Sequence, residues 1–207
     1  MRIEELKPSK RVQGRWLAVL EDGSVLRVGE GEVIDFALYA GKELADGEAQ
    51  GLVAAARRSG LKEKALDLLT RNPMSRKELE RKLQEWEAGE EETASICARM
   101  EELGFLNDGE YGAMLVRDLC RRGYGPRRIR QYLREKLLDL PDIEQAMEAY
   151  VLQPEKMQAY IETKLRGQTP DRKALKRVAD GLFRRGFSWD EIQHALRDYS
   201  LNMEDVL

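Results

Sequence analysis

The chain has 207 residues, which suffices for one or two domains. Charged residues make up 35% and aromatic residues 7%, a profile that suits solvated amphipathic helices better than a thick β core. The net charge of −3 excludes a polycation, so a nucleic-acid contact has to come from local patches, and a protein partner is equally allowed. Cys97 and Cys120 are isolated, so we expect buried apolar residues rather than a disulfide or metal ligands.

Targeting signals are absent from the sequence pattern. No stretch reaches 18 apolar residues, and no apolar run near the N-terminus precedes a cleavage site. We therefore expect a cytoplasmic protein with no membrane span.

The first element in chain order is a β-hairpin. Residues 11–20 and 25–28 are β-prone and flank the turn 21–24, which contains Asp-Gly. A two-stranded hairpin is marginal alone, so it should pair with a further strand or pack on a helix. Its expected apolar face consists of Val12, Trp16, Ala18 and Leu20, extended by Val25.

A short apolar segment at 33–39 follows, as helix or strand, and Asp46 then caps a helix to about Arg58. Gly51 is a weak point inside that helix because glycine lowers helix stability. Residues 1–59 are thus predicted to form an N-terminal extension with a hairpin and a helix.

From Leu61 onward the pattern is helical, with many recognisable caps. Ser75 with Glu78 and Ser188 with Glu191 are predicted capping boxes. The other start signals are Asn107 with Glu110, Gly125-Pro126, Asp139 with Asp142, and Thr169-Pro170. These signals predict nine short helices, at about 61–71, 75–87, 93–104, 108–122, 126–138, 140–150, 154–166, 170–185 and 189–199.

The nine helices contain an internal repeat. Segment 75–83 aligns with 125–133 and again with 171–179: each has a start signal, a basic pair, and apolar residues four apart. A period in the high forties corresponds to a three-helix unit, and such units stack on their neighbours. The predicted fold is mainly α: three tandem three-helix repeats at 60–107, 108–152 and 153–207, in an elongated curved array behind the extension.

The second repeat is centred on the helix that begins at Gly125-Pro126. At 100° per residue, Ile129, Leu133 and Leu137 share a face and are expected to be core residues. Arg127, Arg130 and Arg134 gather on another face.

The repeat places a basic pair near the start of each middle helix. Such pairs can form a stripe that follows a phosphate backbone or a long acidic groove. The alternative is that these first turns simply face water. The candidate binding residues are Arg76, Lys77, Arg121, Arg122, Arg127, Arg128, Arg130, Arg134, Arg172 and Lys173.

The sequence offers little for catalysis. His194 is the only histidine and is expected on a helix surface. There is no set of residues with metal-ligand spacing, no nucleophile elbow and no glycine-rich phosphate loop, so we expect no catalytic, metal or cofactor site. The tryptophans should be packing residues, although Trp189 follows a cap and can be partly exposed at a groove.

At this point the pattern resembles a known family, RecX. The order of the motifs carries the resemblance, and no single motif would. The matching segments are 75–79 with 82–83, 103–108 with Tyr111 and Val116, 125–129 with Leu133, and 185–187 with Ile192 and 195–196. The resemblance covers about residues 61–200, and some family members carry a similar N-terminal extension.

The resemblance implies three tandem three-helix repeats, a cytoplasmic location and no catalysis. It implies binding to the recombinase RecA and to its filament on single-stranded DNA, with modulation, mostly inhibition, of ATP hydrolysis, strand exchange and co-protease activity. A monomer is expected, and a weak direct contact with DNA is allowed.

The chain departs from the family pattern at several places. Family members often have Lys-Gly where Lys136-Leu137 stands, so here the middle helix is expected to continue to Leu138. Gly112 stands where alanine is usual and is expected to be a soft spot. The acidic run 90–92 puts in doubt a DNA contact along all three repeats.

Three binding hypotheses stay open at the level of sequence. The first is a regulator that docks into the RecA filament. The second is a stand-alone helical-repeat nucleic-acid-binding protein without RecA, and the third is a structural adaptor that does not depend on the basic stripe.

Overall fold

The structure is a computed structural model that describes residues 1–165 and 171–199. The chain divides into two compact units. The first unit consists of Met1–Asn72 and Leu79–Phe105, and the second of Pro73–Glu78 and the residues from Leu106 onward.

The N-terminal part contains a three-stranded antiparallel sheet with the order β1-β2-β3. Its strands are β1 (Ile3–Pro8), β2 (Arg15–Leu20) and β3 (Val25–Gly29). The predicted hairpin and its further strand are therefore confirmed. Ala18 and Leu20 are buried as expected, but Val12 and Val25 are wrong as core residues. Val12 lies before β2 and is 37% exposed, and Val25 is 53% exposed because the buried face of β3 passes through Val28.

Residues 30–35 form helix α1 (Glu30–Asp35), which settles the open choice for the segment at 33–39 in favour of a short helix. The next helix, α2 (Asp46–Arg71), runs for 26 residues. We expected two helices here, and that expectation is wrong. The buried residues Leu52, Ala56, Leu61, Ala65 and Leu69 continue at helical spacing, so Gly60 is tolerated inside one helix. The boundary predicted at residues 59 and 60 falls within α2.

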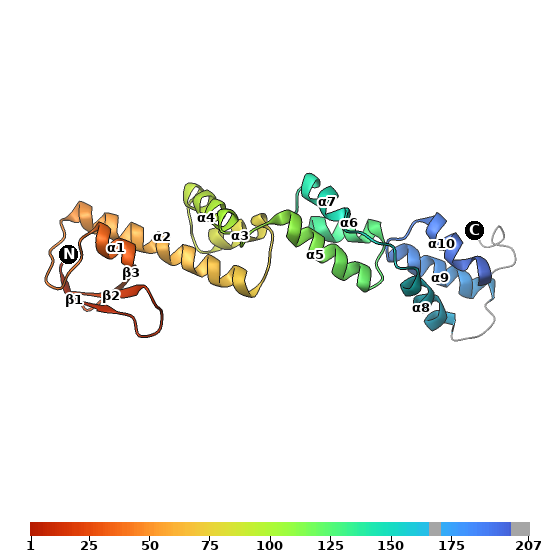
Figure 1. The fold of residues 1–207 in the computed structure, drawn as a ribbon, viewed down its shortest axis with the longest axis horizontal. Coiled ribbons are helices and arrows are strands. Elements are labelled where there is room, and N and C mark those ends of the chain that lie inside the picture. The colour runs from red at the N-terminus through yellow and green to blue at the C-terminus, as the bar shows by residue number, and fades with distance from the viewer. Residues whose placement is uncertain (166–170, 200–207) are drawn as a thin grey trace. The chain divides into compact units, whose positions relative to one another are not determined.

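The remaining helices follow the predicted order (Figure 1). They are α3 (Arg76–Glu85), α4 (Glu90–Glu102), α5 (Asp108–Arg121), α6 (Pro126–Glu135), α7 (Leu140–Met147), α8 (Pro154–Leu165), α9 (Arg172–Arg184) and α10 (Trp189–Leu196), followed by a short 3₁₀ turn, η1 (Arg197–Tyr199). The start signal expected at Thr169-Pro170 lies outside the described residues.

Most of the predicted caps are confirmed. Glu78 N donates to Ser75 Oγ (3.2 Å) and Ser75 N donates to Glu78 Oε2 (3.1 Å), which completes the capping box of α3. The box at Ser188 and the cap at Asn107 are also formed. Asp139 is the N-cap residue of α7, which confirms the start signal predicted there, although its side chain makes no capping hydrogen bond.

Helix α6 ends at Glu135, so the prediction that it continues to Leu138 is wrong. Leu137 adopts a left-handed conformation (φ 61°) and closes the helix end, with its amide donating to Arg134 O (2.9 Å). Consequently Leu137, which was expected in the core, is only half-buried, and Leu138 takes that core position instead, with 5% exposure. Ile129 and Leu133 are buried as predicted.

The cores of the second and third repeats are separate clusters. In the second, α5 packs closely against α7, and a Cβ atom placed on Gly112 would lie 2.7 Å from Ala146 Cβ. Gly112 is therefore a close-packing position rather than a soft spot. Cys97 and Cys120 are buried, as expected.

Candidate interaction surface

The basic pairs at the starts of the middle helices are not in the same register. Arg76 and Arg172 are the first residues of α3 and α9, whereas Pro126 is the first residue of α6. Lys77, Arg127 and Lys173 consequently share the second helical position. One cation per repeat, rather than a pair, occupies an equivalent place.

In the second unit, the start of α6 is joined to the end of α9 through backbone groups. Gly125 N donates to Arg185 O (2.9 Å) and Arg127 N donates to Gly186 O (3.2 Å). A Cβ atom on Gly125 would lie 2.5 Å from backbone atoms of Gly186 and Phe187. Only glycine permits this approach, so Gly125 acts in packing as well as in starting the helix.

Side chains strengthen the same junction. Arg127 Nη2 donates to Phe183 O (2.7 Å), and the guanidinium lies 3.8 Å from the centre of the Phe183 ring. Arg185 Nη1 donates to the carbonyl oxygens of Arg122 and Gly123, both at 3.2 Å. Arg127, one of the candidate residues, and Arg185 therefore hold the second and third repeats together, a role that the sequence pattern did not indicate.

The first turn of α3 makes a corresponding junction with the end of α6. Ser75 Oγ donates to Lys136 O (2.7 Å), Lys136 Nζ donates to Glu78 Oε1 (3.1 Å), and Lys77 forms an ion pair with Asp139. Arg76 contributes its backbone amide, which donates to Asp108 Oδ1 (2.7 Å). Lys77 and Arg127, at equivalent positions, both reach toward the following repeat.

The groups around Glu78 are partly removed from water. Burial raises the pKa of Tyr111 to about 12, with a further contribution from the negative charge of Glu78. Burial is the largest single influence on Lys136 and acts to lower its pKa, but the hydrogen bond to Glu78 and the charges of Tyr111, Glu78 and Tyr132 together raise the pKa, so Lys136 stays charged.

On α6, the remaining candidates face the solvent with acidic neighbours. Arg130 makes two hydrogen bonds to the Glu144 carboxylate, at 3.2 and 3.3 Å, and these lower the pKa of Glu144. Arg128 pairs with Glu135 at 3.4 Å. The Arg134 side chain is exposed and forms no hydrogen bond or ion pair among the described residues, but its charge contributes to the lowered pKa of Glu144.

At the end of α5, Arg121 and Arg122 both pair with Asp118, at 3.4 and 3.6 Å. Their side chains are 72% and 58% exposed, so these ion pairs contribute little to stability and both arginines can turn to another anion.

Helix α9 carries the most open group of cations. Arg172 and Lys173 are exposed, as are Lys176 and Arg177 one turn later, which were not among the predicted residues. None of the four has a hydrogen-bond or ion-pair partner within residues 1–165 and 171–199. Spacing by three and four residues could have identified Lys176 and Arg177, because residues at that spacing are neighbours on a helix.

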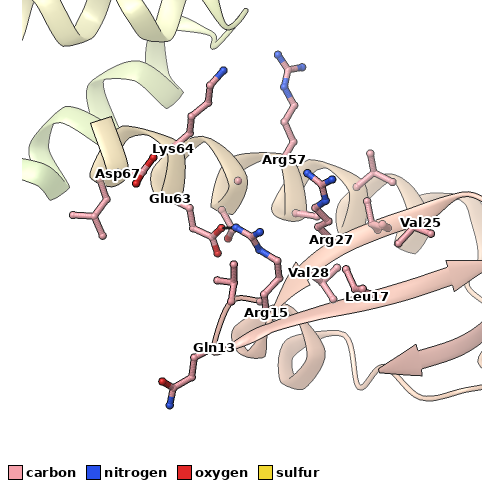
Figure 2. Close-up of a pocket in the computed structure, with 18 of the residues that line it drawn as sticks. Gln13, Arg15, Leu17, Val25, Arg27, Val28, Arg57, Glu63, Lys64 and Asp67 are labelled. Carbon is pink, nitrogen blue, oxygen red and sulfur yellow. Dashed lines mark hydrogen bonds and ion pairs between the residues drawn. The ribbon is translucent and has the colours of Figure 1, made fainter. Parts of the chain in front are cut away.

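The first unit contains an open groove between its sheet and α2, with a volume of about 1290 Å³ (Figure 2). Figure 2 shows Arg15 of β2 reaching toward Glu63 of α2, with which it forms an ion pair. Val25 and Val53 are exposed residues of its wall. The groove joins segments far apart in sequence, so no local motif predicts it.

Two further properties concern the described residues only. None of their helices combines the length and the apolar content that crossing a membrane requires. Residues 1–165 and 171–199 contain no group of three or more His, Cys, Asp or Glu side chains that could hold a metal ion.

Comparison with known families identifies the three repeats. Models of the first, second and third three-helix domains of RecX match residues 62–100, 107–147 and 153–196, in that order. The chain belongs to the RecX family. The predicted family and the three-repeat helical fold with its small N-terminal sheet are thereby confirmed.

Individual RecX proteins match over most of their length. A regulatory protein RecX from Limosilactobacillus reuteri is 29% identical over 214 residues, covering 99% of this chain and 79% of that protein. One from Pseudomonas syringae pv. tomato is 36% identical over 134 residues, covering 64% and 86%.

Solved RecX structures share the fold. A crystal structure of regulatory protein RecX has a TM-score of 0.73 at 26% identity and covers 95% of this chain and 98% of its own. RecX from Lactobacillus salivarius gives 0.66 at 27% identity, covering 72% and 99%. The family is named for regulation, and this chain is a RecX-type regulatory protein.

Proposed function

We propose that this chain binds RecA and its filament on single-stranded DNA and modulates, mostly by inhibition, RecA ATP hydrolysis, strand exchange and co-protease activity. The observation that carries the proposal is the ordered match of all three RecX domains. In this proposal the chain acts in the cytoplasm as a monomer, without catalysis or a cofactor of its own, and residues 60–107, 108–152 and 153–207 act as its repeats.

The basic residues have two roles in the proposed complex. Lys77 and Arg127 hold successive repeats together through Asp139 and Phe183. Arg134, Arg172 and the other exposed cations then meet acidic groups or phosphates of the filament. This division follows from the contacts, because an arginine fixed against a backbone carbonyl loses hydrogen bonds when it turns to a new anion.

RecA-dependent ATP hydrolysis on single-stranded DNA tests the proposal. Added wild-type protein should lower the rate, and the variant Arg134→Glu/Arg172→Glu/Lys173→Glu should require a several-fold higher concentration for the same effect. These side chains are exposed, so their reversal should leave the free energy of unfolding within about 0.5 kcal/mol.

A matched control reverses an exposed arginine outside the repeats, Arg11→Glu, which should inhibit as the wild type does. Unchanged ATP hydrolysis on addition of wild-type protein would overturn the proposal. Equal inhibition by the triple variant would instead remove the role of these three cations.

The second candidate is a stand-alone nucleic-acid binder, which the open cations of α9 favour. Direct phosphate binding weakens steeply with salt, by about 0.7 log units per log unit of salt for each single-strand contact. Tight binding to free single strands near physiological salt, with no gain from RecA, would support this candidate against the regulator.

A further inference from the structure

An aromatic stack lies at the junction between the second and third repeats. The rings of Phe183 in α9 and Trp189 in α10 are stacked, with centroids 5.1 Å apart and planes inclined by 22°. The guanidinium of Arg127, from α6, also lies against the Phe183 ring, at 3.8 Å from its centre. Three planar groups from three helices thus meet at one place.

The stack is held from several sides. Arg127 donates to Phe183 O (2.7 Å), which fixes the guanidinium against the ring. Trp189 is the first residue of α10, directly after Ser188, whose capping box with Glu191 fixes the start of that helix. A ring fixed in advance loses little conformational entropy when a ligand binds to it.

Part of the tryptophan ring remains open. Trp189 is 39% exposed, although Trp is highly buried on average in folded proteins. Trp16 and Trp86 are less exposed, and Trp86 carries Lys64 over its ring at 3.8 Å. Trp189 is therefore the tryptophan whose surface a ligand can reach most readily.

The surroundings of this ring are rich in positive charge. The segments that form the stack contribute the arginines at 127–128 and 184–185, and Arg184 is exposed beside Phe183. Of the two carboxylates that follow Trp189, Glu191 accepts from Ser188 N (2.7 Å) and Asp190 is exposed. An exposed indole ring near guanidinium groups can bind a ligand that combines a flat ring, which stacks on the indole, with a negative charge.

We propose that Trp189, supported by Phe183 and Arg127, is a stacking platform for an unpaired nucleobase of single-stranded DNA. Arg184, which is exposed beside Phe183, binds a phosphate next to that base. A protein side chain would fit the apolar ring alone, whereas a nucleotide satisfies both the ring and the cations. The inference rests on the proposed function only in that the RecA filament supplies the single strand.

Tryptophan fluorescence without RecA tests the platform. In the variant Trp16→Phe/Trp86→Phe, Trp189 is the remaining tryptophan, and titration with oligo(dT) at low salt should quench its emission. An abasic oligonucleotide of equal length keeps the phosphates and lacks the bases, so it should leave the emission nearly unchanged and bind roughly 5-fold to 100-fold more weakly.

A second arm measures binding of labelled oligo(dT) by fluorescence anisotropy. Trp189→Leu should weaken binding by a similar factor, Trp189→Phe should retain part of the affinity, and Phe105→Leu, an exposed aromatic residue of the first unit, should bind as the wild type does. Equal binding of abasic and base-bearing strands, or quenching by RecA without DNA, would overturn the platform. Since RecA ATP hydrolysis is assayed separately, failure of the platform leaves the proposed function standing.

Discussion

The substitution Gly125→Ala probes the backbone junction between α6 and the end of α9. The added Cβ atom would lie 2.5 Å from the carbonyl group of Gly186 and the amide of Phe187, all backbone atoms that no side-chain rotation can move. The start of α6 must therefore move away from Gly186, which breaks the hydrogen bonds of Gly125 N to Arg185 O (2.9 Å) and Arg127 N to Gly186 O (3.2 Å).

The expected loss of stability follows from these contacts. Two hydrogen bonds contribute about 0.5–1.5 kcal/mol each, and overpacking adds about 1–3 kcal/mol. The stiffer unfolded chain of alanine and its weaker N-cap preference nearly cancel. We expect a loss of about 3 kcal/mol in the free energy of unfolding, or a urea midpoint lower by about 1.5 M at a slope of roughly 2 kcal/mol/M.

Urea unfolding followed by circular dichroism measures this loss, and hydrogen exchange of the Arg127 amide locates it. The matched control is Gly89→Ala, at the N-cap of α4, where the backbone is similarly extended (φ −71°, ψ 166°) and an added Cβ meets nothing within 4 Å. The control should unfold within about 0.5 kcal/mol of the wild type. If Gly125→Ala matches the control in both measurements, the junction does not stabilise the second unit.

Four further substitutions separate packing, charge and backbone strain. Gly112→Ala should destabilise the protein by about 1–3 kcal/mol in urea unfolding, because its Cβ would lie 2.7 Å from a side chain of α7. Gly51→Ala, whose Cβ would have its nearest neighbour at 3.5 Å, should stabilise it by about 0.5–1 kcal/mol. Equal effects of the two substitutions would refute the packing argument. Arg130→Gln should raise the pKa of Glu144 toward 4.5 in an NMR titration. Because the pKa of Glu144 is lower in the folded than in the unfolded protein, its ion pair stabilises the fold above the unfolded pKa, and this stabilisation is lost as pH falls through the folded pKa. If the wild type stayed more stable than Arg130→Gln in acid, the argument would be contradicted. Leu137→Gly should stabilise the protein by about 0.5 kcal/mol, because removing the strain of a left-handed leucine outweighs the conformational entropy that glycine loses on folding. A clearly lower midpoint of thermal unfolding would show instead that the contacts of the half-buried leucine side chain outweigh this strain.

Local signals made much of the fold predictable. The capping box of Ser75 and Glu78 and the start signal at Gly125-Pro126 act within four residues, so the sequence displays them directly. The hairpin turn and the buried Ile129 and Leu133 are likewise local. Their physical cause lies in adjacent backbone and side-chain preferences.

The wrong predictions concern places where the chain does not follow such preferences. We expected one helix to end at about Arg58 and another to begin at residue 61, but buried residues on both sides of Gly60 continue α2 through it. Leu137 suggested a continuing helix, but α6 ends before it, and its amide donates to Arg134 O.

The cations of the candidate surface could be predicted from the sequence, but which of them hold the repeats together and which remain open to a partner could not. Arg127 contacts Phe183, 56 residues away, and no local spacing reveals such a contact. Which cations are fixed and which are open depends on the fold of the second unit, because acceptors such as the carbonyl of Phe183 are brought into reach only there.

The junction between α6 and α9 also bears on self-association. It is directional: the end of one middle helix meets the start of the preceding one, and repetition of that contact between molecules would generate an open filament rather than a closed dimer. At the start of α9, the N-cap residue is Asp171, whose carboxylate accepts from Ala174 N (2.7 Å). A charged side chain thus stands where α6 has Gly125, so the start of α9 does not offer the close backbone approach that Gly125 permits.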